Sequence, residues 1–229
     1  MGSNALSIQT QPWSSLEQQV RGTGTGNTEH LQGTRRVKMR SATNWDEVVF
    51  GEIVDDSAFG PRFDGGLYDD TGNVATLRTT DISEDGRISY GTMPYARLDE
   101  SHFEKHFLRP NDLVITRSGR IGTSAVFAGF EAPVLPGAFL IRFRLAPQAI
   151  PQFYCYYFNG PVGQQLLRSI ARGAAQQNIS GQNVMALRVP FPPLPAQRRI
   201  ADILSAYDDA IENNRRRIKL LEDAARHLY

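Results

Sequence analysis

Two short segments of this 229-residue chain carry the residue types that proteins use to contact DNA. The first is Thr116–Gly122, with the sequence TRSGRIG. Its glycines would let the main chain approach a phosphate closely, and an arginine can donate two hydrogen bonds to O6 and N7 of guanine. The segment therefore predicts a DNA contact made by Arg117, Ser118 and Arg120. A tight turn with solvent-facing arginines is the alternative.

The second segment is Arg172–Asn178, with the sequence RGAAQQN. Glutamine and asparagine side chains can bond adenine at two points, which makes Arg172, Gln176 and Gln177 candidates for reading bases. Arg78 and Thr79 follow an apolar run and are weaker candidates of the same kind. For these two residues a plain role at a sheet edge fits equally well.

The charges of the chain are almost balanced, with 25 Lys and Arg against 24 Asp and Glu. Net charge therefore neither favours nor excludes a nucleic-acid partner. The distribution is more informative, because residues 132–201 contain no Asp or Glu. This acid-free stretch carries Arg142, Arg144, Arg168, Arg172, Arg188, Arg198 and Arg199. It is an electrostatic footprint that would attract phosphate, unless the segment is mostly buried and lacks acids by chance.

Several patterns that resemble catalytic motifs lack a necessary part. The FPPL sequence at 191–194 is similar to a loop of adenine methyltransferases but has no leading polar residue, and the glycines at 22–26 follow no strand. His102 and His106 have helical metal-ligand spacing without a third ligand, which favours a surface pair. The single cysteine, Cys155, reads as a small buried hydrophobe. The sequence argues against an enzyme and predicts neither a metal nor a cofactor in this chain.

The composition divides the chain into three parts. Residues 1–43 are rich in Gly, Ser, Thr and Gln and read as a flexible arm, whose basic end could touch phosphates or be simply solvated. Residues 44–190 predict a β-rich domain with a few helices, so the expected fold class is α+β. The runs that read as strands are Val48–Gly51, Val74–Leu77, Asp85–Ile88, Leu113–Thr116, Ala125–Phe127 and Phe139–Phe143. Residues 152–171 have the longer apolar spacing of one or two helices.

Residues 191–229 predict a proline linker and a long helix. The apolar positions step by four and three residues, as in a coiled-coil seam formed by Ile200, Leu204, Tyr207, Ile211, Asn214, Ile218, Leu221, Ala225 and Leu228. A helix from about Ala196 would be on the order of 50 Å long, so part of this seam should find a partner helix. Asn214 would then fix the register through a hydrogen bond across the pair. A helix folded back on its own domain is the alternative.

Three sequence motifs resemble the specificity subunit of type I restriction-modification enzymes. Residues 189–204, VPFPPLPAQRRIADIL, together with DDAIE at 208–212, resemble the linker and the first part of the subunit's helical region. Residues 112–122 resemble a strand and turn of its target-recognition domain, and QQNIS at 176–180 resembles the segment before the last strand. The resemblance covers residues 45–229 with the motifs in the same order.

The resemblance implies a non-catalytic subunit that reads DNA. In this family two recognition domains are joined by two long antiparallel helices, and each domain reads half of a split site. Methyltransferase subunits that bind S-adenosylmethionine dock on the helices, and endonuclease subunits that use ATP and Mg join them. Because this chain has one recognition domain and one helix, the resemblance implies a half-size subunit. Two copies paired through the seam would then read a palindromic split target in double-stranded DNA.

Two further expectations complete the interpretation. No stretch approaches the roughly 18 apolar residues of a membrane span, and the first residues lack the layout of a signal peptide, so we expect a cytoplasmic protein without a membrane partner. The rival hypothesis is an adaptor or inhibitor that does not bind DNA and pairs through its helix with a full-length specificity subunit.

Overall fold

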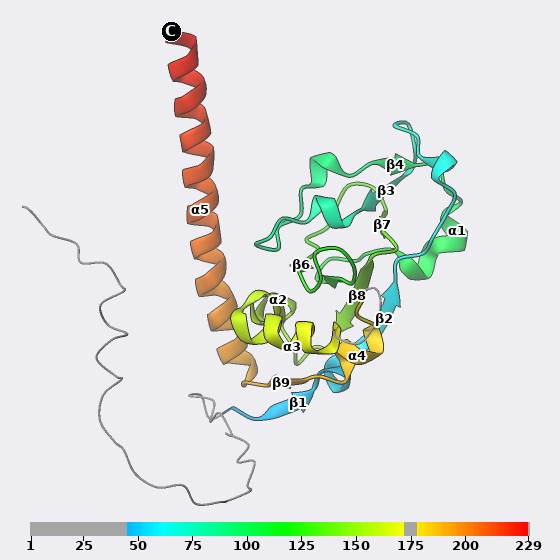
Figure 1. The fold of residues 1–229 in the computed structure, drawn as a ribbon, viewed down its shortest axis with the longest axis vertical. Helices are drawn as coiled ribbons and strands as arrows, with labels where there is room; N and C mark the ends of the chain where they lie inside the picture. The colour runs from blue at the N-terminus through cyan, green and yellow to red at the C-terminus, as the bar shows by residue number, and fades with distance from the viewer. Residues whose placement is uncertain (1–44, 172–177, 229) are drawn as a thin grey trace, which may run out of the picture. The chain divides into compact units, whose positions relative to one another are not determined.

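The computed structural model describes residues 45–171 and 178–228, which hold a mixed α and β domain followed by one long helix (Figure 1). Strands in these ranges form three small sheets. The larger sheet is antiparallel, with the order β2 (Val54–Phe59), β8 (Leu140–Leu145), β5 (Leu113–Thr116) and β6 (Ser124–Val126). The second has the order β4 (Tyr95–Ala96), β3 (Val74–Leu77) and β7 (Val134–Pro136), with β3 and β7 parallel. The third pairs β1 (Glu47–Val49) with β9 (Arg188–Pro190).

Helices connect and cover these sheets. They are α1 (Glu100–Phe103), α2 (Pro151–Asn159), α3 (Pro161–Ala171), α4 (Gly181–Met185) and α5 (Leu194–Leu228). Short 3-10 turns lie at Phe50–Ile53, Gly65–Leu67, Thr79–Asp81, Tyr90–Thr92 and Glu104–His106. Proline begins both α2 and α3, where its missing N–H costs nothing because the first turn of a helix leaves that group unpaired.

Strand β5 is buried on both faces, which explains its uninterrupted apolar sequence. Successive side chains of a strand point to opposite faces. Leu113 and Ile115 join the core in which the rings of Phe50 and Phe158 meet at 5.1 Å. Val114 joins a second core, which it shares with residues of β3 and β7. The central strands therefore connect two cores, and the loops at their ends are held from both sides.

The α+β fold class is confirmed, and the predicted helical region at 152–171 is two helices separated at Gly160. Helix α5 begins at Leu194, within the predicted proline linker, because Pro195 lies in its first turn, where proline is tolerated. The predicted arm at residues 1–43 lies outside the described residues.

The prediction of a strand at Asp85–Ile88 is wrong. These residues form a turn, which we call the 83–88 turn, and only an isolated bridge joins Ile82 to Ile88. Gly86 has a φ of 81°, a left-handed conformation that a strand does not contain, and its N–H donates to the carbonyl of Ser83 at 3.1 Å.

Candidate nucleic-acid interface

The Thr116–Gly122 loop is a closed turn between β5 and β6. The N–H of Gly122 donates to the Thr116 carbonyl at 2.8 Å, and the Thr116 hydroxyl donates to the carbonyl of Arg120. Gly119 and Gly122 have φ values of 72° and 84°, which favour glycine at both positions. Since the main chain closes on itself, the side chain of Arg120 is left at the surface, where it lies 3.8 Å from the Glu84 carboxylate.

Arg117 lies in a surface patch with two exposed aromatic side chains. Its guanidinium carbon is 4.6 Å from the ring centroid of Phe59, which is a cation–π contact. The main-chain N–H of Arg117 donates to the Phe139 carbonyl at 2.9 Å. Its buried Nε has no hydrogen-bond partner among the described residues. Phe139 is 54% exposed and Phe59 41%. We call Phe59, Arg117 and Phe139 the Arg117 patch; it combines a positioned guanidinium with two uncovered aromatic side chains.

The structure brings residues on either side of the second candidate segment to the same loop. The N–H of Ile179 donates to the Arg117 carbonyl at 3.1 Å, and Gln164 of α3 donates to the Gly122 carbonyl at 2.8 Å. Arg172, Gln176 and Gln177 lie outside the described residues, so their roles stay predictions. Residues that flank the second candidate segment therefore contact the Thr116–Gly122 loop, although the two candidate segments are about fifty residues apart in the sequence.

Arg78 is tied to its own domain. Its Nη2 donates to Asp81 at 2.8 Å and to the carbonyl of Thr92 at 2.7 Å, and its Nε donates to Asp81 at 3.0 Å. The hydrogen bond to Asp81 also raises the pKa of Arg78. Thr79 begins the 3-10 turn that these bonds stabilise. DNA contact by Arg78 and Thr79 stays a prediction, but most donors of Arg78 already have partners.

The acid-free stretch is not uniformly available to phosphate. Arg142 is 1% exposed and donates to Asp56 at 2.8 Å, which lowers the pKa of that carboxyl. Arg144 donates twice to buried Asp112, both at 2.9 Å. The two acids come from outside the stretch, so a count along the sequence could not reveal the pairing. The exposed members among the described residues are Arg168, Arg188, Arg198 and Arg199.

Replacing Asp112 with alanine should lower the free energy of unfolding by about 3 kcal/mol, because partly buried Arg144 loses the nearer of its two carboxylate partners and keeps only Asp56 at 3.4 Å. The change also removes the acceptor of the Arg109 N–H, which donates to Asp112 at 2.8 Å. Chemical denaturation measures the loss, with Asp70→Ala at an exposed position as the control. An unchanged midpoint would show that the Asp112 pair contributes nothing to stability.

The base of α5 is fixed to the domain by a buried amide. Gln197 is fully buried, and its Nε2 donates to the Pro192 carbonyl at 2.8 Å while its Oε1 accepts from the N–H of Ile150 at 2.9 Å. Higher on the helix, the Tyr156 hydroxyl donates to Asp208 at 2.6 Å. Ile200, the first seam position, packs against the domain's own core. Ile200 is therefore less available to a partner helix than the rest of the predicted seam, because the domain already covers part of its side chain.

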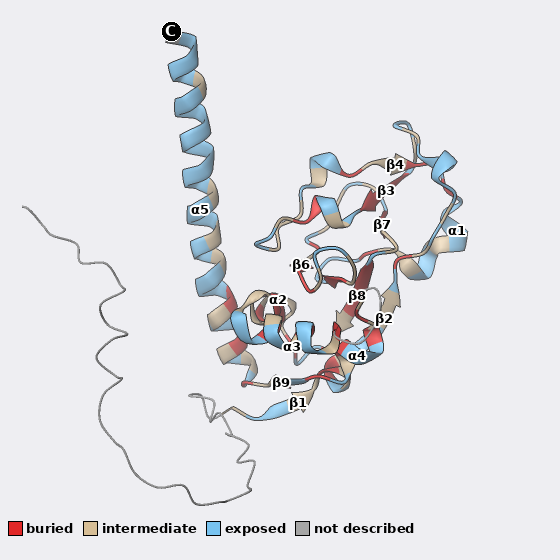
Figure 2. Ribbon diagram, in the orientation of Figure 1, coloured by how far each residue is buried: buried red, intermediate tan, exposed pale blue. Residues whose placement is uncertain are grey.

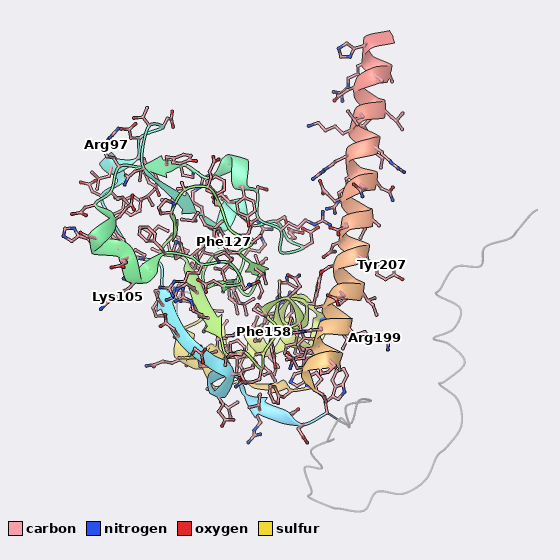
Figure 3. The ribbon with its side chains drawn as sticks, turned by 180° about the vertical axis from the view of Figure 1, so that it is seen from behind. Arg97, Lys105, Phe127, Phe158, Arg199 and Tyr207 are labelled. Atoms are coloured by element: carbon pink, nitrogen blue, oxygen red, sulfur yellow. The ribbon has the colours of Figure 1, made fainter. Side chains whose placement is uncertain are left out.

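The seam positions beyond the base are exposed (Figure 2). The exposed members are Leu204, Tyr207, Ile211, Asn214, Ile218, Leu221 and Ala225; the side chain of Leu228 is outside the description. Tyr207 is 66% exposed and points away from the domain (Figure 3). The side chains that contact the domain, Asp208 and Glu212, lie roughly a third of a turn around the helix at 3.6 residues per turn. The domain and a partner helix can therefore use different faces of α5.

The cysteine and the histidine pair that the sequence singled out have structural surroundings. Burial raises the pKa of the Cys155 thiol to about 12, as the reading of a buried hydrophobe expects. His106 Nδ1 lies 3.2 Å from the Phe59 carbonyl, and His102 is exposed beside Asp99. No group of three or more His, Cys, Asp or Glu that could hold a metal occurs in the described ranges. No helix in the described part is long and apolar enough to cross a membrane.

Comparisons with known proteins agree on one family. The family model described as the type I restriction modification DNA specificity domain matches residues 43–223. The putative MjaX specificity subunit of Methanocaldococcus jannaschii is 27% identical over 61% of this chain and 34% of its own length. The EcoKI specificity subunit of Escherichia coli K12 is 26% identical over 56% of this chain and 29% of its own. The chain thus spans about a third of these curated relatives.

Solved structures share the fold. The HsdS subunit from Thermoanaerobacter tengcongensis superposes with a TM-score of 0.56 at 19% identity, covering 78% of this chain and 41% of that one. A chain from a study of assembly and conformational transition of the type I R-M system gives a TM-score of 0.60 at 18% identity, covering 79% and 42%. Because the family match covers most of the sequence, the chain belongs to the type I restriction-modification DNA specificity domain family.

Proposed function

We propose that this chain reads one half of a bipartite DNA target as the specificity subunit of a type I restriction-modification system. The observation that carries the proposal is the Arg117 patch, where a guanidinium is held against the ring of Phe59 beside the exposed side chain of Phe139. A fixed arginine fork suits O6 and N7 of guanine, and apolar contact suits the methyl group of thymine. The exposed side chain of Arg120 on the same loop supplies a phosphate contact.

The proposal includes pairing of two copies through α5. Exposed apolar side chains at heptad spacing support it, because a lone helix does not leave such a row in water without cost. An antiparallel pair would set two recognition domains apart around a twofold axis, because each domain is attached at the base of its own helix. In this arrangement Asn214 lies on the seam and would bond across it.

Partner subunits supply the chemistry in this proposal. Methyltransferase subunits with S-adenosylmethionine dock on the paired helices, and endonuclease subunits with ATP and Mg join them. The chain itself positions these partners on DNA, catalyses nothing and works in the cytoplasm.

Co-expression with a methyltransferase subunit tests the function. Single-molecule sequencing should map methylated adenines to a palindromic motif split by a fixed spacer. DNA binding by the complex should weaken steeply as salt rises, because contacts to phosphate release counterions. Absence of a methylated motif together with the absence of salt-dependent DNA binding would favour the adaptor that pairs with a full-length subunit and does not bind DNA.

A further inference from the structure

The 83–88 turn reaches across to the middle of α5 (Figure 1). Arg87 Nη1 lies 2.6 Å from the Glu212 carboxylate, and its Nη2 donates to the carbonyl of Asp208 at 3.1 Å. Beside this contact, Arg215 Nη1 lies 3.0 Å from the carboxylate of Asp85. Two arginines, one from each side, therefore join the turn to the helix.

The turn is a rigid support for these side chains. Its Ser83 N–H donates to the carbonyl of Arg87 at 2.9 Å. A Cβ at Gly86 would lie 2.3 Å from the Ser124 carbonyl oxygen and 2.5 Å from Nδ2 of Asn159, so the turn rests directly on β6 and α2. Asn159 is itself fixed, because its amide exchanges two hydrogen bonds with Ser124, both at 2.8 Å. Arg87 is therefore presented from a backbone that has little freedom to move.

Ion pairs, rather than apolar packing, join the turn to α5. A groove of about 580 Å³ lies between them, lined by Asp85, Arg87, Ser205, Asp209 and Glu212 among others. The paired side chains are 26% to 58% exposed, so they remain in contact with solvent. Salt should weaken this attachment, since exposed pairs are screened.

The turn holds α5 beyond the attachments to buried Gln197 at its base and to Asp208, which accepts from the Tyr156 hydroxyl. About 27 Å of helix at 1.5 Å per residue separates Gln197 from Arg215. The turn therefore extends the part of α5 whose direction the domain fixes from Asp208 to Arg215. The direction of the exposed seam relative to the Arg117 patch then depends on the turn.

We infer that the 83–88 turn sets the direction of α5 against the recognition domain and thereby selects the number of base pairs between the two half-sites. The spacer step rests on the proposed function. A tilt of about 4° displaces the end of a helix about 50 Å long by about 3.5 Å, close to the 3.4 Å rise of one base pair. Loss of the contact would therefore admit neighbouring spacers without altering the half-site sequence.

Distances between spin labels at Asp70→Cys and Glu222→Cys, both exposed positions, test the contact in the full chain. Labelled protein is mixed with excess unlabelled chain, so that only distances within one chain count. We expect a narrow distribution that broadens when Arg87→Ala and Arg215→Ala are combined, which removes both pairs, and does not broaden further when Glu212→Ala is added. Arg226→Ala, which removes a helix arginine paired with Asp223, is the matched control and should leave the distribution narrow. An unchanged distribution in the Arg87 and Arg215 double variant overturns the contact whether or not the chain binds DNA.

Methylation maps with the partner methyltransferase test the spacer step. The double variant Arg87→Ala, Arg215→Ala should keep the half-site sequences and add spacers about one base pair shorter or longer. A broadened distance distribution with one unchanged spacer overturns the link to spacing. If the unaltered chain gives no methylated motif, the proposed function fails and the spacer step with it, while the distance measurement still decides the helix contact.

Discussion

If two copies pair through α5 as proposed, replacing Ile211 and Ile218 with glutamate is expected to convert the pairs to monomers and to abolish methylation of the proposed split site. Both side chains are about half exposed on the seam, away from the residues that contact the domain. Burying an isoleucine contributes roughly 1.5–3 kcal/mol, and the double change removes four of them from a dimer. Because the single chain already covers about half of each isoleucine, the loss is about 3–6 kcal/mol, roughly 10²- to 10⁴-fold in the dimer dissociation constant. Sedimentation velocity over a range of concentrations measures it.

Leu220→Glu is the matched control for the seam. Leu220 is as exposed as Leu221 but lies on another face of α5, since it is two residues from Ile218 along a helix of 3.6 residues per turn. This variant should stay paired and should fold like the unaltered chain. Pairing that survives in the Ile211 and Ile218 double variant, or that is lost equally in Leu220→Glu, would exclude the seam as the interface.

The elements that the sequence predicted best are those with a clear period. β5 could be predicted because a strand buried on both faces has an uninterrupted apolar run, which is visible in the sequence alone. α5 could be predicted because apolar residues at steps of four and three persist along its length. The 83–88 turn was missed because Ile88 and its neighbours look like a short strand. Only the left-handed backbone at Gly86 and its contact with Ser124 decide against it.

The candidate site was predictable only where residue type alone carries the signal. The TRSGRIG sequence identified the loop of Arg117, but Phe59 and Phe139 were missed, because aromatic residues in or beside strands usually belong to a core. Arg144 looked free because Asp112 is far away in the sequence. Pairings of this kind depend on how distant strands meet, which local patterns do not contain.

Replacing Arg117 with alanine is expected to weaken binding to the cognate half-site by about 5- to 150-fold, the effect of losing 1–3 kcal/mol from a two-point contact with guanine. Arg117→Lys keeps the charge and an aliphatic stem over Phe59 but cannot make that contact, so it should lose the same discrimination. Arg97→Ala, at an exposed arginine paired with Asp69, is the control. Fluorescence anisotropy of the complex on cognate and single-base-altered DNA measures both affinity and discrimination.

The salt dependence of these variants distinguishes a base contact from a phosphate contact at Arg117. If Arg117 reads a base edge, alanine relaxes preference at one position and leaves the slope of affinity against salt unchanged. If it contacts phosphate, alanine weakens binding to all sequences, reduces the slope by about one, and lysine restores most of the affinity. The guanidinium favours the first result, because Phe59 and the hydrogen bonds of the loop main chain to Phe139 and Ile179 hold it in one place. A fixed planar guanidinium strengthens a two-point contact with a base more than it strengthens a general attraction to phosphate. Unchanged affinity and discrimination in Arg117→Lys would therefore show that Arg117 does not read a base.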